Sequence, residues 1–492
     1  MRAEMDWIEK IPGIAMPLEG AVLLSFFTAA FLTSMFEKEE RPAYLLLLFG
    51  FTLSLPFLLP FFAGFSYPQW ISLTLVCIPI LCLLVLFFPF RGRIDYSMQN
   101  PADRFDERDT MFSRRTLVPG SKLFNEYYAR RPGNKPLDNK FRKLPGLLKA
   151  GTKYYDPIIF AAANSIFDRV IQELHPRVEG EVASPDSSGG TASEHSDILL
   201  KMAVDWGAHS AGIAELQDYH VYSHGGRGSR YGQEIKVDHK YALALTVEMD
   251  YDMMRAAPAA PTVLESANQY LQSGMIGVQL AEFIRSLGYP ARAHIDGDYH
   301  VICSLVARDA GLGEIGRMGL LMTPRLGPRC RIAVVTTDLP LVASPPRPQA
   351  TTIDFCRRCE KCALVCPSQS IQFGPEQGSE APIQTDIPHQ TDILHKTNTL
   401  HETEALPGSG VIIGGNEKIK RWKIDDAGCF AYWCLAGTDC GRCMIVCPYA
   451  HPDNWFHRFI RFGIRNNAIF RRLAIPMDDL FYGRKPKQRD FR

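Results

Sequence analysis

The sequence lacks an excess of charge of either sign. Its 54 lysines and arginines are almost balanced by 53 aspartates and glutamates, which leaves a formal net charge of +1. Proteins that bind nucleic acid through its phosphates usually carry a marked basic surplus. The overall charge therefore gives no reason to expect a nucleic-acid partner.

The sequence also has few cysteines outside one region, because nine of the 13 lie between positions 356 and 447. The remainder are too scattered for a disulfide framework, and the clustered ones suggest metal chemistry in a reducing compartment. The glycine-rich stretch 307–341 has G-x-G-x-x-G spacing at 311–316, but no strand pattern precedes it, so a dinucleotide fingerprint is not supported.

The clustered cysteines follow ferredoxin spacing. Residues 356–367, CRRCEKCALVCP, read C-x2-C-x2-C-x3-C-P, in which three thiolates share one tight loop and the fourth serves the other cluster of a pair. Residues 440–448, CGRCMIVCP, repeat the ending but lack a nearby first cysteine, which Cys429 or Cys434 could supply. Structural zinc is the alternative, but zinc favours two spaced pairs. Two [4Fe–4S] clusters are therefore predicted.

Three long apolar runs occupy residues 18–36, 42–65 and 70–90. A helix needs roughly 20 apolar residues to cross a hydrocarbon core of about 30 Å, and each run is long enough. A cleaved signal peptide is a poor alternative for the first run, since no A-x-A site is apparent and two further runs follow. We expect three transmembrane helices and a lipid bilayer as partner.

The distribution of basic residues predicts the orientation of these helices. Lys38 and Arg41 lie in the first loop, the 66–69 loop has no basic residue, and several arginines follow residue 90. Basic loops remain on the cytoplasmic side. We therefore expect a multi-pass protein of the inner membrane with everything after residue 91 in the cytoplasm.

Residues 198–345 have the mixed pattern of a layered α/β domain. Helical spacing covers 198–216 and 266–289, the latter ended by a glycine, while 241–249 and 331–339 read as buried strands.

Two later stretches have their own composition. An insertion at about 374–415 repeats a six-residue unit with His389, His395 and His401, which we interpret as an exposed loop rather than a metal site. The segment 456–492 is basic and aromatic, and it fits either a membrane-surface helix or an arm packed on the domain.

Several stretches of the sequence resemble the cobalamin-dependent reductive dehalogenases. The glycine-rich block 307–341 followed by the ferredoxin run is the most specific of them, and 106–121, 248–250 and 478–486 look like the same family. Epoxyqueuosine reductase is a more distant relative. The resemblance covers roughly 95–492 and implies a nitroreductase-like α/β domain that binds a base-off corrinoid, with two [4Fe–4S] clusters delivering electrons to it.

The resulting fold class is α+β, in four segments. Residues 1–95 form the membrane anchor and 96–345 the cobalamin-binding domain. A ferredoxin-like domain follows at 346–455, and 456–492 is a basic C-terminal arm.

The resemblance also implies site residues. The family's acid corresponds to Tyr270, its helper arginine to Arg329, and a polar family position to Asp296 or Asp298. Related chains place the lone cysteine before an aromatic–Trp segment, which favours Cys429. The expected corrinoid contacts are Gly313, Gly316, Gly319, Leu320, Leu321 and Thr323. The expected cluster ligands are Cys356, Cys359, Cys362 and Cys447 for one cube, and Cys440, Cys443, Cys366 and Cys429 for the other.

We thus predict a membrane-anchored reductive dehalogenase that acts on a small organohalide. Its electron donor would be a ferredoxin, a flavodoxin or a quinol-linked membrane protein. A guanidinium beside Tyr270 is expected to lower the pKa of its phenol. The alternatives are an epoxyqueuosine-reductase-like enzyme and an electron-transfer protein without corrinoid. The three spans and Tyr270 disfavour the first, and the glycine-rich block has no purpose in the second.

Overall fold

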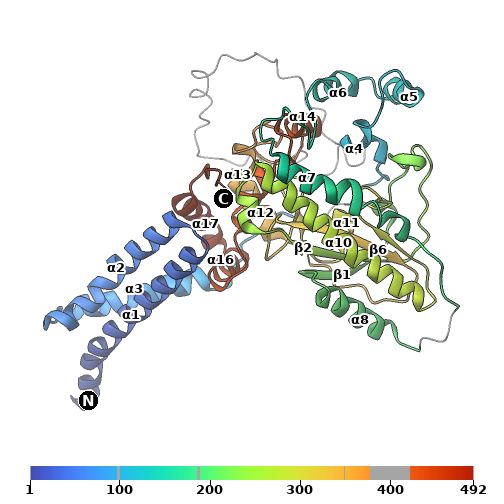
Figure 1. The fold of residues 1–492 in the computed structure, drawn as a ribbon. Helices are drawn as coiled ribbons and strands as arrows, with labels where there is room; N and C mark the ends of the chain where they lie inside the picture. The colour runs from blue at the N-terminus through green and yellow to red at the C-terminus, as the bar shows by residue number, and fades with distance from the viewer. Residues whose placement is uncertain (1, 97–99, 185–188, 348, 377–421, 491–492) are drawn as a thin grey trace. The chain divides into compact units, whose positions relative to one another are not determined.

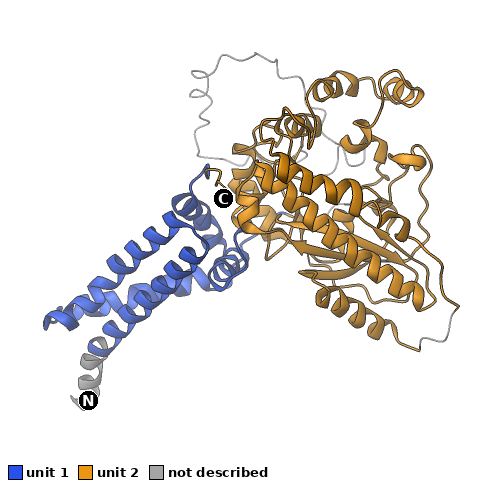
Figure 2. Cartoon of the chain, in the orientation of Figure 1, with its two compact units in different colours: residues 1–95, 451–486 blue, residues 96–450, 487–492 orange. Residues whose placement is uncertain are grey.

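The computed structural model describes residues 2–96, 100–184, 189–347, 349–376 and 422–490. The chain forms two compact units (Figure 2), one of residues 1–95 with 451–486 and one of residues 96–450 with 487–492. This division differs from the four predicted segments. The C-terminal helices belong with the N-terminal ones, and the α/β and ferredoxin-like segments share one unit. The hexad histidines lie outside the described residues.

The first unit contains the three apolar helices, α1 (Arg2–Phe36), α2 (Glu40–Ala63) and α3 (Gln69–Phe87). In each of them a stretch, from Gly13 in α1, is long and apolar enough to cross a membrane. Few side chains of these stretches are buried within the protein, as expected for lipid-facing residues. The three predicted spans are thus present as helices.

Two amphipathic helices complete this unit, α16 (Trp455–Asn466) and α17 (Ala468–Tyr482). Asn454 caps α16 by accepting a hydrogen bond from the backbone N–H of His457, and Asn467 caps α17 through Phe470 in the same way. The two helices pack against each other as a hairpin.

The second unit is built on an antiparallel sheet of order β1-β2-β6-β3 (Figure 1). Its strands are β1 (Ser210–Glu215), β2 (Tyr241–Glu248), β3 (Ala291–His294) and β6 (Cys330–Thr337). The central strands β2 and β6 are almost entirely buried, which explains their continuous apolar runs in the sequence.

Helices cover both faces of this sheet. On one face α8 (Ala192–Asp205) and α10 (Ala260–Ser286) enclose the largest hydrophobic core, and on the other lies α11 (Cys303–Asp309). The predicted helix over 198–216 is wrong in its second half. The helix ends at Asp205, Gly207 follows with a φ of +108°, and the chain continues as β1.

Short elements surround the layered core. The N-terminal stretch of the unit contributes α4 (Met111–Arg114), α5 (Lys122–Arg130), α6 (Asn134–Arg142) and α7 (Pro157–Ser165). Between them and the cysteine region come α9 (Tyr251–Arg255) and a small hairpin of β4 (Glu314–Ile315) and β5 (Leu321–Met322). The cysteine region itself has α12 (Ala350–Cys359), α13 (Lys361–Leu364), α14 (Asp426–Ala436) and α15 (Arg442–Ile445).

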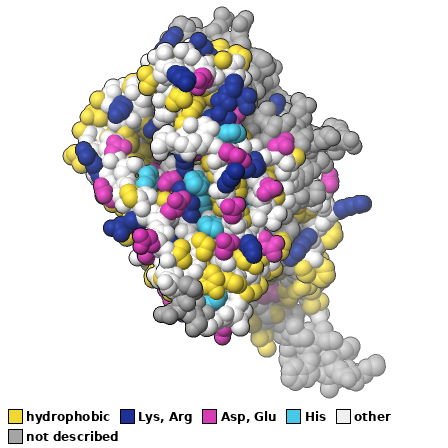
Figure 3. All heavy atoms as spheres, turned by 90° about the vertical axis from the view of Figure 1, so that its right-hand side faces the viewer, with side chains coloured by type: hydrophobic (Ala, Val, Ile, Leu, Met, Phe, Trp, Pro, Cys, Tyr) yellow, Lys and Arg dark blue, Asp and Glu magenta, His cyan; other side chains and the backbone are white. Residues whose placement is uncertain are grey.

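The surface of the second unit carries both signs of charge. Figure 3 shows lysine, arginine, aspartate and glutamate side chains interspersed over one face of the molecule. This pattern agrees with the near-zero net charge of the sequence.

Candidate redox and proton-transfer site

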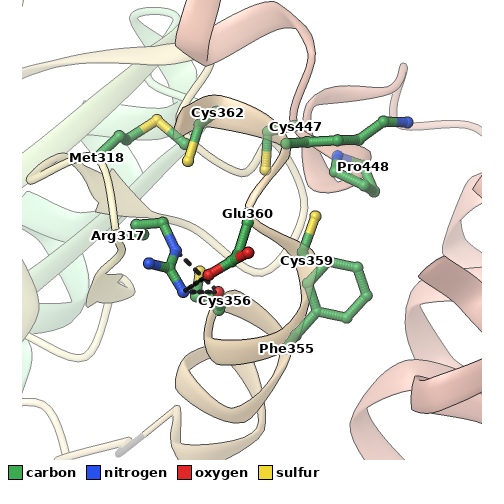
Figure 4. Close-up of a pocket in the computed structure, with 10 residues that line it drawn as sticks. Arg317, Met318, Phe355, Cys356, Cys359, Glu360, Cys362, Cys447 and Pro448 are labelled. Atoms are coloured by element: carbon green, nitrogen blue, oxygen red, sulfur yellow. Dashed lines mark hydrogen bonds and ion pairs between the residues drawn. The ribbon is translucent and has the colours of Figure 1, made fainter. Parts of the chain in front are cut away.

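Two cysteine runs that are far apart in the sequence meet around one cavity. Cys356, Cys359 and Cys362 line it from α12, α13 and the turn between them, and Cys447 enters from the second run (Figure 4). Three of the four side chains are buried, and Cys359 is the more exposed one. Burial raises the pKa of Cys447 well above its usual range, and electrostatic interaction with these three thiols raises it further.

A residue with a left-handed backbone conformation interrupts each of the two cysteine runs. Glu360, directly after Cys359, has a left-handed φ of 55° and separates α12 from α13. Gly441, directly after Cys440, has a φ of 65° and precedes α15 in the same manner. A left-handed residue reverses the chain at each point, so the cysteines before and after the turn face the same side. The two runs therefore form a structural repeat.

The second set of cysteines is also brought together. Burial, and after it the nearby thiols of Cys440 and Cys366, raise the pKa of Cys429 to about 12. Burial raises the pKa of Cys443, and all three of these thiols raise it further. Cys434 instead packs in an apolar cluster with residues of α4 and α6. Cys429, and not Cys434, is thus the additional cysteine beside this set.

The raised thiol pKa values describe the protein without metal. Buried neutral thiols are unreactive, and iron must displace their protons to bind. Among the described residues, no three cysteine, histidine or acidic side chains converge closely enough to hold a single metal ion. Zinc would need thiolates about 2.3 Å from one centre, whereas a four-iron cube spreads its four ligands. The C-x2-C-x2-C-x3-C-P spacing of the sequence favours the cube.

A buried cation supports the first set. Arg317, which is 1% exposed, donates hydrogen bonds to the Cys356 carbonyl at 3.0 and 3.1 Å and to the carbonyls of Gln372 and Gly374 at 2.8 Å. Its guanidinium lies 4.7 Å from the ring centroid of Trp422. The side chain therefore joins the cysteine loop to the two segments that flank the insertion, and it places a fixed positive charge beside the cavity.

Tyr270 lies on α10 next to an arginine of β6. The Arg331 guanidinium is 4.9 Å from the centroid of the tyrosine ring, and it bonds Asp439 at 2.8 Å and Ser266 at 2.6 Å. Because Asp439 directly precedes Cys440, this group of polar residues adjoins the second cysteine set. Tyr270 is only partly exposed.

We call Tyr270, Arg331 and Asp439, together with Asp296 and Tyr299, the recess, and burial dominates its acid–base properties. It raises the pKa of Tyr270, and the positive charges of Arg331 and Arg227 only partly oppose it. Burial also raises the pKa of Asp296 and of Tyr299. The expectation that an arginine brings the phenol below its usual pKa is therefore wrong. Tyr270 keeps its proton at neutral pH.

The partner predicted for Tyr270 is corrected as well. Arg329 is fully buried and turns away from the tyrosine, with its Nε bonded to the carbonyl of Ala450 and its Nη1 paired with Glu248 at 2.8 Å. The reason is local: Arg329 lies in the turn before β6, while Arg331 lies within the strand under α10. Arg331 occupies the position that the sequence assigned to Arg329.

The two candidate aspartates differ in their partners and in the direction of their pKa shifts. Asp298 is held by Arg230 at 2.6 Å and Arg292 at 2.8 Å, and these pairs overcome burial and lower its pKa. Asp296 instead interacts electrostatically with Tyr270, while its backbone carbonyl contacts Nε2 of His175 at 2.7 Å. Asp296 is the aspartate of the recess.

The glycine-rich block adjoins the first cysteine set. A Cβ on Gly316 would lie 2.6 Å from Cγ of Met322 and 3.5 Å from Sγ of Cys356, so only glycine fits there. Gly313 packs against the Met322 carbonyl, and the Thr323 hydroxyl donates to the Gly327 carbonyl at 3.2 Å. Of the remaining predicted corrinoid contacts, Leu321 is buried in a core cluster, Gly319 has a left-handed φ, and Leu320 is 36% exposed.

Sequence reasoning missed several residues of the recess. Tyr299 stands one position beyond the stretch considered for the aspartate, and Arg331 stands two beyond the chosen arginine. Strand alternation does not separate Arg331 from Arg329, because residues two positions apart lie on the same face of a strand. The remaining charged residues come from distant loops, and no local pattern marks them: Arg115, Arg227 and Asp439.

Comparison with known families supports the cluster region directly. A family model for a 4Fe-4S dicluster domain matches residues 355–451. Both structurally repeated cysteine runs fall inside that range, and so does Cys429.

Curated relatives share the wider sequence. The chain is 31% identical over 240 residues to the tetrachloroethene reductive dehalogenase of Sulfurospirillum multivorans, which covers 49% of this chain and 41% of that protein. It is 31% identical over 222 residues to the enzyme of the same name from Desulfitobacterium hafniense, covering 45% and 35%. The matches thus span less than half the length of these relatives.

Solved structures share the fold. The catabolic reductive dehalogenase NpRdhA in complex with 3-bromo-4-hydroxybenzoic acid matches with a TM-score of 0.59 and 23% identity, covering 80% of this chain and 49% of that one. Another NpRdhA structure matches with a TM-score of 0.52 and 25% identity, covering 66% and 42%. The chain is therefore similar to the reductive dehalogenases in both sequence and fold, as its motifs predicted.

Proposed function

We propose that the protein is a membrane-anchored reductive dehalogenase that removes halide from a small organohalide. The observation that carries this proposal is the placement of a partly buried tyrosine–arginine pair beside one of two convergent cysteine sets. Such a site can bring electrons and a proton to the same bound molecule. The named activity of the curated relatives and their 31% identity support the same reaction class.

The two cysteine sets would hold two [4Fe–4S] clusters in crossed fashion. One cluster would be bound by Cys356, Cys359, Cys362 and Cys447, and the other by Cys366, Cys429, Cys440 and Cys443. The second set adjoins the recess through Asp439, so electrons would leave from the second cluster. The donor would be a ferredoxin, a flavodoxin or a quinol-linked protein.

The recess fits a buried polar cofactor or substrate. Two buried polar atoms there, Nε of Arg331 and Oδ1 of Asp439, have no hydrogen-bond partner among the described residues. Unsatisfied buried groups are costly unless a ligand completes them. We assign the corrinoid to the space beside Tyr270, Asp296 and Tyr299, with the backbone of 313–323 and Leu320 as further contacts. A bound corrinoid supplies the electron-transfer chemistry of carbon–halogen reduction.

Tyr270 would give the proton that replaces the halide on carbon. Its raised pKa keeps the phenol protonated at neutral pH, which a proton donor needs. Arg331, beside the ring, would stabilise the phenolate that remains after transfer. Arg331 is therefore a positioning residue, and Tyr270 the acid.

The three apolar helices would anchor the enzyme in the inner membrane, with the second unit in the cytoplasm. The basic residues that follow α3 support this orientation, because such residues stay on the cytoplasmic side.

One experiment tests the whole proposal. Protein reconstituted anaerobically with iron, sulfide and cobalamin should bind about eight irons and one cobalt per chain. It should also release halide from a panel of haloaromatics and haloalkenes with reduced methyl viologen. Full iron and cobalt content with no halide release from any compound would overturn the dehalogenase assignment. Full iron content with no cobalt would instead indicate an electron-transfer protein.

A further inference from the structure

The hairpin of α16 and α17 packs against the C-terminal end of α3. Asn467, between the two helices, donates through Nδ2 to the carbonyl of Phe88 at 2.9 Å. The ring of Phe87 lies 4.6 Å from that of Phe459 on α16 and 5.2 Å from that of Phe470 on α17. Polar and aromatic contacts together fix the hairpin at this point of the first unit.

The other two apolar helices meet the hairpin at the same end. Near the C-terminal end of α1, Thr33 accepts a hydrogen bond from the Trp455 indole at 3.0 Å, and Glu37 pairs with His457 at 3.2 Å. α2 contacts α17 through its N-terminal half. These helix ends border the loop 37–41 and the segment after residue 87. If the three helices span a bilayer, the hairpin must therefore lie at its boundary.

The outward face of the hairpin is apolar with a basic margin. Four exposed residues of α17 are spaced by four, four and three positions and so lie on one face: Ile469, Leu473, Met477 and Leu480, each 41–45% exposed. On α16, Phe462 is 48% exposed. The exposed cations beside them are Arg472, Arg484 and Lys485.

We propose that the α16–α17 hairpin is an interfacial element whose apolar stripe enters the acyl-chain boundary and whose cations bind the phosphates of anionic phospholipids. The contacts with α1, α2 and α3 place the stripe where a bilayer begins, and amphipathic helices with basic margins favour anionic surfaces. A second copy of the chain is the competing occupant. This inference goes beyond the proposed catalysis and does not depend on it.

Photo-cross-linking of the full chain tests the location. Benzoylphenylalanine is placed at position 473, and in a matched control at position 204, where Val204 is 51% exposed on α8 of the other unit. In vesicles of phosphatidylcholine with phosphatidylglycerol, lipid adducts at position 473 should exceed those at 204 by roughly tenfold, because only the former residue belongs to the unit that contains the apolar helices. Cross-linked chain dimers in place of lipid adducts, or equal adducts at both positions, would overturn the proposal.

A charge variant tests the headgroup preference separately. Replacing Arg472, Arg484 and Lys485 together by glutamine removes the exposed cations and leaves the apolar stripe. Phosphatidylglycerol enrichment among co-purifying lipids should fall by about fivefold or more, since each basic residue near an anionic surface contributes about that factor. Unchanged enrichment would refute the anionic-lipid part, even where position 473 still labels lipid.

Discussion

The tyrosine–arginine pair offers the sharpest test of the proposed chemistry. Tyr270→Phe keeps the ring that lies 4.9 Å from the Arg331 guanidinium and removes only the hydroxyl. A positioned acid typically contributes about 10²–10⁴-fold to rate. Halide release by Tyr270→Phe should fall by that factor while iron and cobalt content stay unchanged. Tyr289→Phe, which alters a partly buried tyrosine away from the recess, serves as the matched control.

Substitution of the arginine adds a pH signature. A cation–π contact of this kind is worth about 0.5–2 kcal/mol, which corresponds to roughly two- to thirtyfold in rate. Arg331→Gln should lose at least that much, because Asp439 would also lose its cation. The positive charge of Arg331 lowers the pKa of Tyr270. Its removal should therefore raise that pKa further and move the alkaline limb of the rate profile to higher pH.

The outcome that refutes this reasoning is specific. If Tyr270→Phe turns over near the wild-type rate with full cofactor content, the proton comes from another group. If Arg331→Gln slows the reaction but leaves the pH profile in place, Arg331 acts only in packing. If Arg331→Lys keeps the wild-type pH–rate profile, the positive charge of Arg331 is what acts on Tyr270, since lysine keeps the charge but not the planar fork.

Three further predictions concern the clusters and the anchor. Cys429→Ser should lower iron content from about eight per chain, whereas Cys434→Ser should not; the reverse result would exchange their assignments. Arg317→Gln should lower the reduction potential of one cluster in a spectroscopic titration, because a buried positive charge favours the more electron-rich state, and an unchanged potential would contradict this role. A reporter fused after residue 95 should be active only in the cytoplasm, and periplasmic activity would reverse the orientation.

Elements with strong local patterns could be predicted from the sequence. The three apolar runs are helices, and the buried strands at 241–249 and 331–339 correspond to β2 and β6. The helix after 198 was overextended because small and apolar residues on both sides of Gly207 suit either a helix or a strand. Only its position beside β2, set by long-range pairing, decides for the strand.

In the site, too, the residues marked by local patterns could be predicted, and those brought together only by the fold could not. Cysteine spacing is a local signal, so both runs were found, and the distant Cys429 could be proposed. The recess depends on side chains that meet only in three dimensions, such as Asp439 with Arg331. A shift of two residues where β6 begins would exchange the arginine that lies beside Tyr270, and sequence alone does not determine where the strand begins.

The first unit is built from two segments that are far apart in the sequence, so forming it closes a long loop at a cost in free energy. The hydrogen bond from Asn467 to the Val85 carbonyl joins residues 382 positions apart. Closing a loop of that length costs about 3 kcal/mol more than closing a loop of roughly ten residues, because the cost grows only with the logarithm of length. Several aromatic pairs form on closure, each worth about 0.5–1.5 kcal/mol beyond area burial. Since these pairs alone offset the closure cost, the C-terminal hairpin can belong to the anchor even though a whole catalytic unit separates them.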